Sequence, residues 1–125
     1  IDHVNLKIPA DGMEDALAFY RDGLGFAADR LAEYESGRKP FFSIRLADGC
    51  VLHLWPSERF EAPTSVNYDH VAVRLDEPID AVREQVADAG IDVAREGTPL
   101  GATGTAPAVY VEDPFGYRVE LKATA

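Results

Sequence analysis

Hydrophobic and polar residues alternate over the first eight positions of the chain. One set contains Val4, Leu6 and Ile8, and the other contains His3, Asn5 and Lys7. This alternation predicts a β-strand with one buried face. Apolar residues at helical spacing then predict a helix at about 12–23, with Gly23 as its stop signal. Three further strands are predicted at about 26–34, 40–47 and 50–55, separated by the turns Ser36-Gly37 and Asp48-Gly49.

The same pattern recurs at an offset of 67 residues. Segment 1–8 matches 68–75, Gly23 matches Gly90, and 49–54 matches 116–121. The second half accordingly predicts a helix at about 78–89 and strands at about 68–75, 91–95, 107–112 and 117–122. Because three separate anchors share one register without a gap, we interpret the chain as a duplicated βαβββ unit.

The duplication predicts one α+β domain. Its two tandem βαβββ modules are expected to form a curved mixed sheet around a central cleft, with the helices on the outer face. Module one spans about 1–55, a linker about 56–67, and module two about 68–125.

Composition narrows the possible partners. The 125 residues are 46% hydrophobic, and 22 acidic against 12 basic residues give a formal net charge of -10. Nucleic acid is therefore an unexpected partner, because its phosphates need neutralising cations. No apolar run is long enough to span a membrane, so we expect a soluble protein.

Cysteine content and charge also bear on the environment of the protein. Cys50 is the only cysteine, which excludes an internal disulfide and suits the cytoplasm. The acidic bias resembles proteins of salt-loving organisms, although an acidic protein of an ordinary host is the alternative.

All three histidines and one glutamate fall at matching places in the repeat. His3 and His70 open the first strand of each module, while His53 and Glu120 share one position on its last strand. Their apolar neighbours belong to the core, so alternation directs these four side chains to the opposite face. Imidazole nitrogens with a carboxylate suit one divalent ion of iron, manganese, nickel, cobalt or zinc. The alternative is a set of polar residues on a solvated face.

Two motifs add a resemblance to a known family. With the duplication, AFYRDGLGF at 18–26 and DPFGYRVEL at 113–121 resemble the vicinal oxygen chelate superfamily. That superfamily contains glyoxalase I, bleomycin-resistance proteins, fosfomycin-resistance enzymes, methylmalonyl-CoA epimerases and extradiol dioxygenases, and the chain looks closest to its small glyoxalase-domain proteins. The resemblance implies that His3, His53, His70 and Glu120 are metal ligands. It also implies a homodimer, with each site formed within one chain or shared between two.

The identity of residue 53 decides between reaction types. Glyoxalase I-like members usually carry a proton-shuttling carboxylate where this chain has His53, and a histidine could serve as the base instead. Four ligands leave two positions of an octahedral ion for a bidentate substrate. We therefore predict a glyoxalase I-like lyase or isomerase that enolises a small α-oxo substrate, with His53 or Glu120 moving the proton. If His53 stays off the metal, the remaining triad suits an extradiol dioxygenase that uses Fe(II) or Mn(II), with Tyr110 assisting. A binding protein that sequesters a small molecule or drug without turnover is the third hypothesis.

Other residues are weaker candidates. Trp55 could line the substrate pocket, although a core aromatic residue is more common. A substrate carboxylate could bind to one of three cations on the expected ligand face, although structural ion pairs are more usual: Arg74, Arg118 and Lys122. The segment 97–107 contains three glycines and could act as a lid.

Overall fold

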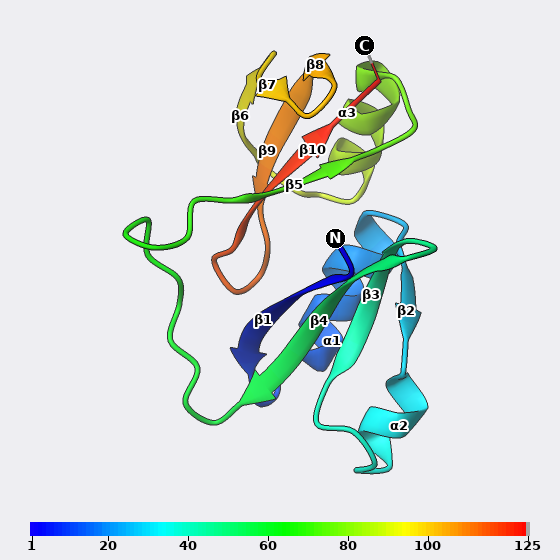
Figure 1. Ribbon diagram of the computed structural model, residues 1–125, viewed down its shortest axis with the longest axis vertical. Helices are drawn as coiled ribbons and strands as arrows, with labels where there is room; N and C mark the ends of the chain where they lie inside the picture. The colour runs from blue at the N-terminus through cyan, green and yellow to red at the C-terminus, as the bar shows by residue number, and fades with distance from the viewer. Residues whose placement is uncertain (125) are drawn as a thin grey trace. The chain divides into compact units, whose positions relative to one another are not determined.

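The computed structural model describes residues 1–124. Residue 125, the last of the predicted second module, lies outside the described residues. The chain divides into two compact units, Ile1–Glu61 and a second unit that begins at Ala62 (Figure 1). Among the described residues, no helix has the length and apolar character needed to cross a membrane.

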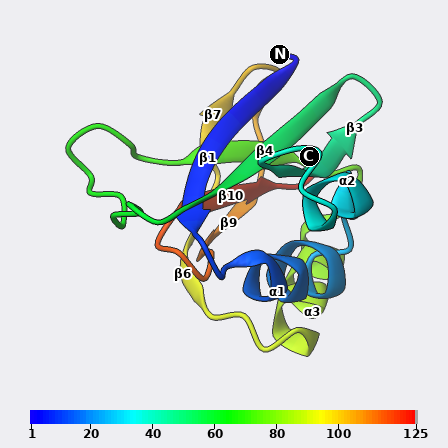
Figure 2. The same ribbon diagram turned by 90° about the horizontal axis from the view of Figure 1, so that it is seen from below.

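The first unit combines one four-stranded sheet with a helical segment. Its elements are β1 (His3–Pro9), α1 (Met13–Ala16), a π-helix η1 (Leu17–Gly23), β2 (Ala27–Asp29), α2 (Leu31–Glu35), β3 (Phe42–Ala47) and β4 (Cys50–Ser57). The strand order is β1-β4-β3-β2, in which β1 runs parallel to β4 and the other neighbours are antiparallel. Helix α1 lies on one face of this sheet (Figures 1 and 2). The core contains apolar side chains of the strands and helix: Ile8, Tyr20, Phe42, Ile44, Leu52 and Leu54.

The second unit repeats this topology. It contains β5 (Val71–Arg74), α3 (Ile79–Asp88), β6 (Val93–Gly97), β9 (Ala108–Glu112) and β10 (Arg118–Lys122), with a small hairpin of β7 (Leu100–Gly101) and β8 (Gly104–Thr105). The sheet order is β5-β10-β9-β6, with β5 parallel to β10. Its core is formed by buried residues of the helix and sheet: Val82, Val86, Val109, Val111, Val119 and Leu121.

The strand registers of the two units also match. Asn5 pairs with His53 in the first unit, and Ala72 pairs with Glu120 in the second. On the other side of the same strands, Ser43 faces His53 and Tyr110 faces Glu120. Each pair follows from its counterpart by the offset of 67 found in the sequence. The predicted βαβββ duplication is therefore confirmed in topology and in register.

The predicted strand at 26–34 is wrong in its second half. Strand β2 ends at Asp29, and Arg30 adopts a left-handed conformation with φ 65° that turns the chain into α2. Leu31–Glu35 contains good helix formers and is followed by Gly37, whose φ of 78° suits the end of a helix. The residues Leu31–Glu35 therefore form a short helix and do not continue the strand.

Two further segments depart from their predictions. The helix predicted at 12–23 continues from α1 into a π-helix, whose wider turn moves the left-handed residue from the expected Gly23 to Gly25. The segment 97–107, expected as a loop, contains the β7–β8 hairpin. Strand β6 also lies slightly later than the predicted 91–95, at Val93–Gly97.

Candidate functional site

His3 and His53 form a pair on the neighbouring parallel strands β1 and β4. Their ring centroids lie 4.5 Å apart. His3 Nδ1 is 2.6 Å from Asp2 Oδ1, and His53 Nδ1 shares a 2.7 Å hydrogen bond with Ser43 Oγ. A side-chain oxygen therefore engages Nδ1 of each ring, which leaves Nε2 of each ring available to bind a metal ion. Phe41 packs against the His53 ring, with centroids 4.5 Å apart.

The surroundings of His53 favour its neutral form. Burial lowers the pKa of His53 below its ordinary value, and the nearby His3 and Arg30 lower it further, while Asp2 acts in the opposite direction. A neutral imidazole is the form that can bind a metal ion or accept a proton. The hydrogen bond from His3 lowers the pKa of Asp2, so this carboxylate stays charged beside the ring.

His70 and Glu120 form the corresponding pair in the second unit. His70 Nδ1 lies 2.5 Å from Asp69 Oδ1, and His70 Nε2 lies 3.0 Å from Glu120 Oε2. The Glu120 side chain is buried, and its second oxygen lies 3.9 Å from Lys122 Nζ. The hydrogen bond from His70 lowers the pKa of Asp69, as His3 does for Asp2. We call His3–His53 the first half-site and His70–Glu120 the second half-site.

Tyr110 packs against the second half-site. Its ring meets His70 edge to face, with centroids 5.6 Å apart, and the Arg95 guanidinium lies 4.4 Å from the Tyr110 ring centre. Tyr110 is also buried and lies opposite Glu120 in the β9–β10 register. The structure thus places the predicted Tyr110 beside both residues of this half-site.

The predicted ligands come together in two pairs, one in each unit. Among residues 1–124 the structure forms no group of three or more His, Cys, Asp or Glu side chains that could hold a metal ion. Each pair nevertheless offers the donor atoms that a divalent cation of the first transition row prefers. That all four residues bind one ion stays a prediction.

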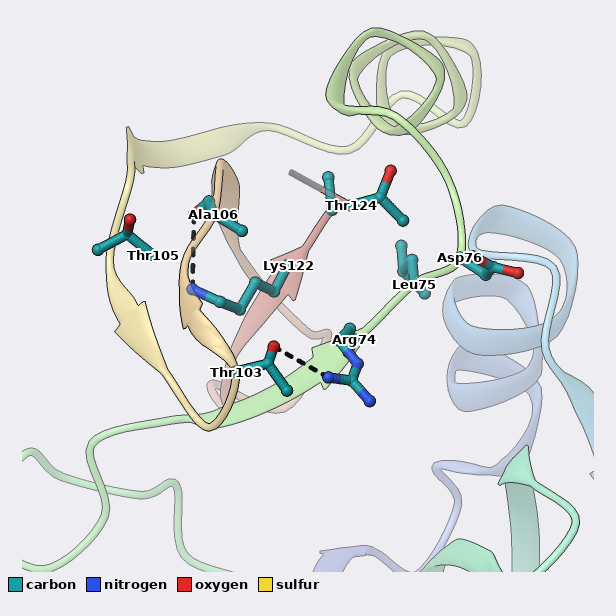
Figure 3. A pocket seen from close by; sticks show the side chains of 9 residues that line it. Arg74, Leu75, Asp76, Thr103, Thr105, Ala106, Lys122 and Thr124 are labelled. Carbon is teal, nitrogen blue, oxygen red and sulfur yellow. Dashed lines mark hydrogen bonds between the residues drawn. The ribbon is translucent and has the colours of Figure 1, made fainter.

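Cavities adjoin both half-sites. In the first unit a cavity of about 260 Å³ is lined by His53, Ser43, Asp2 and Arg30, among others. In the second unit a cavity of about 400 Å³ contains His70, Glu120 and Lys122 in its wall. A further cavity of about 450 Å³ extends past Lys122 toward Thr105 and Thr124 (Figure 3).

The weaker candidates from the sequence have distinct environments. Trp55 is half-buried on the same side of β4 as His53; it stacks on Phe41 at 5.3 Å between ring centroids, and Lys7 Nζ lies 4.6 Å from its ring. Lys122, a candidate for a substrate carboxylate or a structural ion pair, is buried and pairs with Glu120 at 3.9 Å. Arg118 is exposed and lines none of the three cavities described above.

Sequence reasoning missed three residues of the site: Asp2, Asp69 and Ser43. The first two were visible as the repeated dipeptides Asp2-His3 and Asp69-His70, because an acid next to a ligand histidine at two matched positions suggests a role in orienting the ring. Ser43 gave no signal of its own. It could be found only from the strand register, as the counterpart of Tyr110.

Comparisons with known proteins identify relatives of the chain. Residues 1–121 match the family model of the Glyoxalase/Bleomycin resistance protein/Dioxygenase superfamily. The chain is 32% identical to a lactoylglutathione lyase of Neisseria meningitidis over 125 residues, which are 95% of this chain and 86% of the relative. It is 36% identical to a lactoylglutathione lyase of Escherichia coli O157:H7 over 130 residues, covering 95% and 88% of the two chains.

Solved structures show the same fold. A glyoxalase family protein from Bacillus anthracis matches with a TM-score of 0.77 at 24% identity, over 100% of this chain and 94% of the other. A glyoxalase/dioxygenase from Nostoc punctiforme also reaches 0.77, at 21% identity, over 100% and 90% of the two chains.

Proposed function

The chain belongs to the Glyoxalase/Bleomycin resistance protein/Dioxygenase superfamily, and from this premise we propose that it is a glyoxalase I-like lyase or isomerase that depends on a divalent metal ion. The substrate in this proposal is a small α-oxo compound, which the enzyme enolises. The observation that carries the proposal is the matched pair of half-sites. Each joins a histidine with a second donor residue on the neighbouring strand, and His3 and His70 are held by the aspartates that precede them.

We propose His3, His53, His70 and Glu120 as the metal ligands. The donor set fits, because Asp2 and Asp69 occupy Nδ1 of their histidines and leave Nε2 for coordination. A divalent cation held by these residues would act as a Lewis acid toward a substrate carbonyl. The metal could be iron, manganese, nickel, cobalt or zinc, since imidazole and carboxylate ligands suit each of them.

His53 and Glu120 are the proposed proton carriers. Burial and the nearby His3 and Arg30 lower the pKa of His53, and Ser43 holds its Nδ1, so its imidazole can accept a proton at Nε2 when that nitrogen is not bound to the metal. Glu120 offers a buried carboxylate next to His70. Tyr110, packed on His70, helps to exclude water from this side of the site.

The test begins with the metal content of the dialysed protein and with turnover of the hemithioacetal of methylglyoxal and glutathione. We expect stoichiometric metal in the wild type, and loss of both metal and thioester formation in His3→Ala and Glu120→Ala. Glu112→Ala is the matched control, because Glu112 is an exposed carboxylate on the neighbouring strand β9. A wild-type protein that binds no divalent metal and forms no thioester would refute the proposal.

Two variants of His53 separate its proposed roles. His53→Glu gives the first half-site the same chemical groups as the second, so we expect it to retain metal and turnover. His53→Ala should lose metal if the residue is a ligand, whereas retained metal with lost turnover would assign it to proton transfer alone. Cleavage of catechol by the Fe(II)-loaded protein, in place of hemithioacetal turnover, would instead favour the extradiol dioxygenase.

A further inference from the structure

Two cavities of the second unit share the residues Arg74, Thr103 and Lys122. The cavity of about 400 Å³ also contains His70 and Glu120 in its wall, while the cavity of about 450 Å³ continues beyond Lys122. Figure 3 shows Arg74, Thr103 and Lys122 at the centre of the second of these cavities. A small molecule bound beside Glu120 would therefore have two cations within its reach.

Lys122 is buried, and two described carbonyl oxygens accept hydrogen bonds from its ammonium group. Its side chain is only 8% exposed, and its ammonium donates to the carbonyls of Pro99 at 2.5 Å and Ala106 at 3.4 Å. Glu120 Oε1 lies 3.9 Å away, which is beyond hydrogen-bond distance. Because an ammonium has three N–H donors, one remains for another acceptor. A buried positive charge is best stabilised by an anion that accepts this hydrogen bond.

Arg74 contributes a second, more accessible cation. Its Nη1 donates to Thr103 Oγ1 at 3.1 Å, which uses one of the five guanidinium N–H groups. Within the part of the chain that the structure describes, Arg74 makes no ion pair with a carboxylate. Asp76 also lines the larger cavity, but its carboxylate points away from Lys122 (Figure 3). In a chain of net charge -10, Arg74, which makes no ion pair with a described carboxylate, lies at one cavity with Lys122, whose ion pair with Glu120 spans 3.9 Å, and together these cations mark a place that attracts anions.

We propose that Arg74, Lys122 and Thr103 form an anion subsite that selects substrates with a carboxylate or phosphate group beyond the reacting carbonyl. This inference rests on the proposed function, because it assigns the substrate class of the same site. Guanidinium and ammonium groups together suit a compact anion, since the fork of Arg74 can bind two oxygens while Lys122 supplies a point charge. The hydroxyl groups of Thr105 and Thr124 provide further donors in the larger cavity.

Lys122 also has a structural task, which determines how the subsite must be tested. The two carbonyls that it binds, of Pro99 and Ala106, flank the β7–β8 hairpin. A variant of Lys122 can therefore loosen the hairpin whatever its effect on anion binding. Among residues 1–124, the Arg74 side chain makes a single hydrogen bond, to Thr103, so its replacement tests the subsite with little structural cost.

The first experiment compares three hemithioacetals of methylglyoxal as substrates. They are formed with the anionic thiol 3-mercaptopropionate, the neutral thiol 2-mercaptoethanol and the cationic thiol thiocholine. The ratio of kcat/KM for the anionic to the neutral substrate measures the subsite. We expect the wild type to favour the anionic substrate and Arg74→Gln to lower the ratio about tenfold, as for loss of one charge-assisted hydrogen bond. Arg74→Lys should recover part of the preference. Arg118→Gln, which removes an exposed positive charge outside both cavities, should leave the ratio unchanged.

A second experiment does not depend on turnover. Calorimetry measures the binding of pyruvate, methyl pyruvate and inorganic phosphate to the wild type and to Arg74→Gln. We expect pyruvate or phosphate to bind more tightly than methyl pyruvate, and we expect this preference to disappear in Arg74→Gln. The tighter-binding of the two anions shows whether the subsite prefers a carboxylate or a phosphate. Arg74-dependent anion binding without turnover of any hemithioacetal would refute the proposed function and retain the subsite. Turnover without an anionic preference, or with a preference that Arg74→Gln leaves intact, would overturn the subsite alone. Neither turnover nor anion binding would overturn both.

Discussion

Asp69 should control the metal affinity of the second half-site although it is not a ligand. Its Oδ1 lies 2.5 Å from His70 Nδ1, while His70 Nε2 points to Glu120. The carboxylate fixes the orientation and tautomer of the ring and makes Nε2 a better donor to a cation. We therefore expect Asp69→Ala to weaken metal binding without removing a coordinating atom.

The expected loss follows from the exposure of the carboxylate. Carboxylates that orient ligand histidines contribute roughly 10–100-fold in metal affinity. The Asp69 side chain is 75% exposed, so water competes with it for the ring and can replace part of its effect in the variant. The result should lie at the low end of that range, about tenfold. Asp2→Ala should give a loss of similar size, because Asp2 holds His3 in the same way and is 89% exposed.

The assay is a competition titration of metal-free protein against a chromophoric chelator, with Ni²⁺ or Zn²⁺ as the metal. His70→Ala supplies the full loss of a ligand for comparison. Asp88→Ala, which removes an exposed carboxylate from α3 in the same unit, supplies the charge control and should bind metal as the wild type does. Equal metal affinity in Asp69→Ala and the wild type, together with a large loss in His70→Ala, would refute an orienting role for Asp69.

Three further predictions concern the second unit. A Cβ at Gly101 would lie 2.8 Å from Lys122 Cε, so Gly101→Ala should displace Lys122 and speed hydrogen exchange in the β7–β8 hairpin; Gly97→Ala, with open space around its Cβ, should not, and equal exchange in both would contradict the prediction. Burial raises the pKa of Tyr68 from 10.0 to about 12, so its contribution to the free energy of unfolding is complete below pH 10 and is lost as the pH rises toward 12. Tyr68→Phe should flatten this decline in urea titrations between these pH values, and an unchanged slope would exclude Tyr68 as its source. Leu121 is fully buried in the central strand β10, so Leu121→Ala should lower the free energy of unfolding by about 2–5 kcal/mol. A loss below about 1 kcal/mol in the same denaturation experiment would show that the core relaxes around the cavity.

The repeat made much of the fold predictable from the sequence. Because strand alternation has a period of two, matched positions such as His53 and Glu120 must take equivalent places once the register is fixed. The structure confirms this, since His53 pairs with Asn5 and Ser43 at the register positions where Glu120 pairs with Ala72 and Tyr110. Both candidate pairs, His3 with His53 and His70 with Glu120, were therefore predictable within their units.

Local chemistry that the repeat does not share was harder to predict. Strand β2 gives way to α2 at Arg30, whose left-handed conformation is unusual for a residue other than glycine. The second unit has no described helix after its corresponding strand β6, so the comparison of the two halves of the sequence could not predict α2. In the same way, the β7–β8 hairpin has no counterpart in the first unit, and the burial of Lys122 beneath it could not be deduced from strand alternation alone.

The differences between the two half-sites indicate how a duplicated unit can divide its tasks. Position 53 is a half-buried histidine whose pKa is lowered by burial and by His3 and Arg30, whereas its counterpart, Glu120, is a buried carboxylate with Lys122 nearby. The residues facing them have also diverged, from Ser43, which binds an imidazole nitrogen, to Tyr110, which packs against an imidazole face. Arg74, with Lys122, adds positive charge beside the second half-site, and its counterpart Lys7 instead lies over Trp55. Under the proposed function, a charged substrate group would be recognised by the cations of the second unit, while His3 and His53 of the first unit would contribute nitrogen donors to the metal.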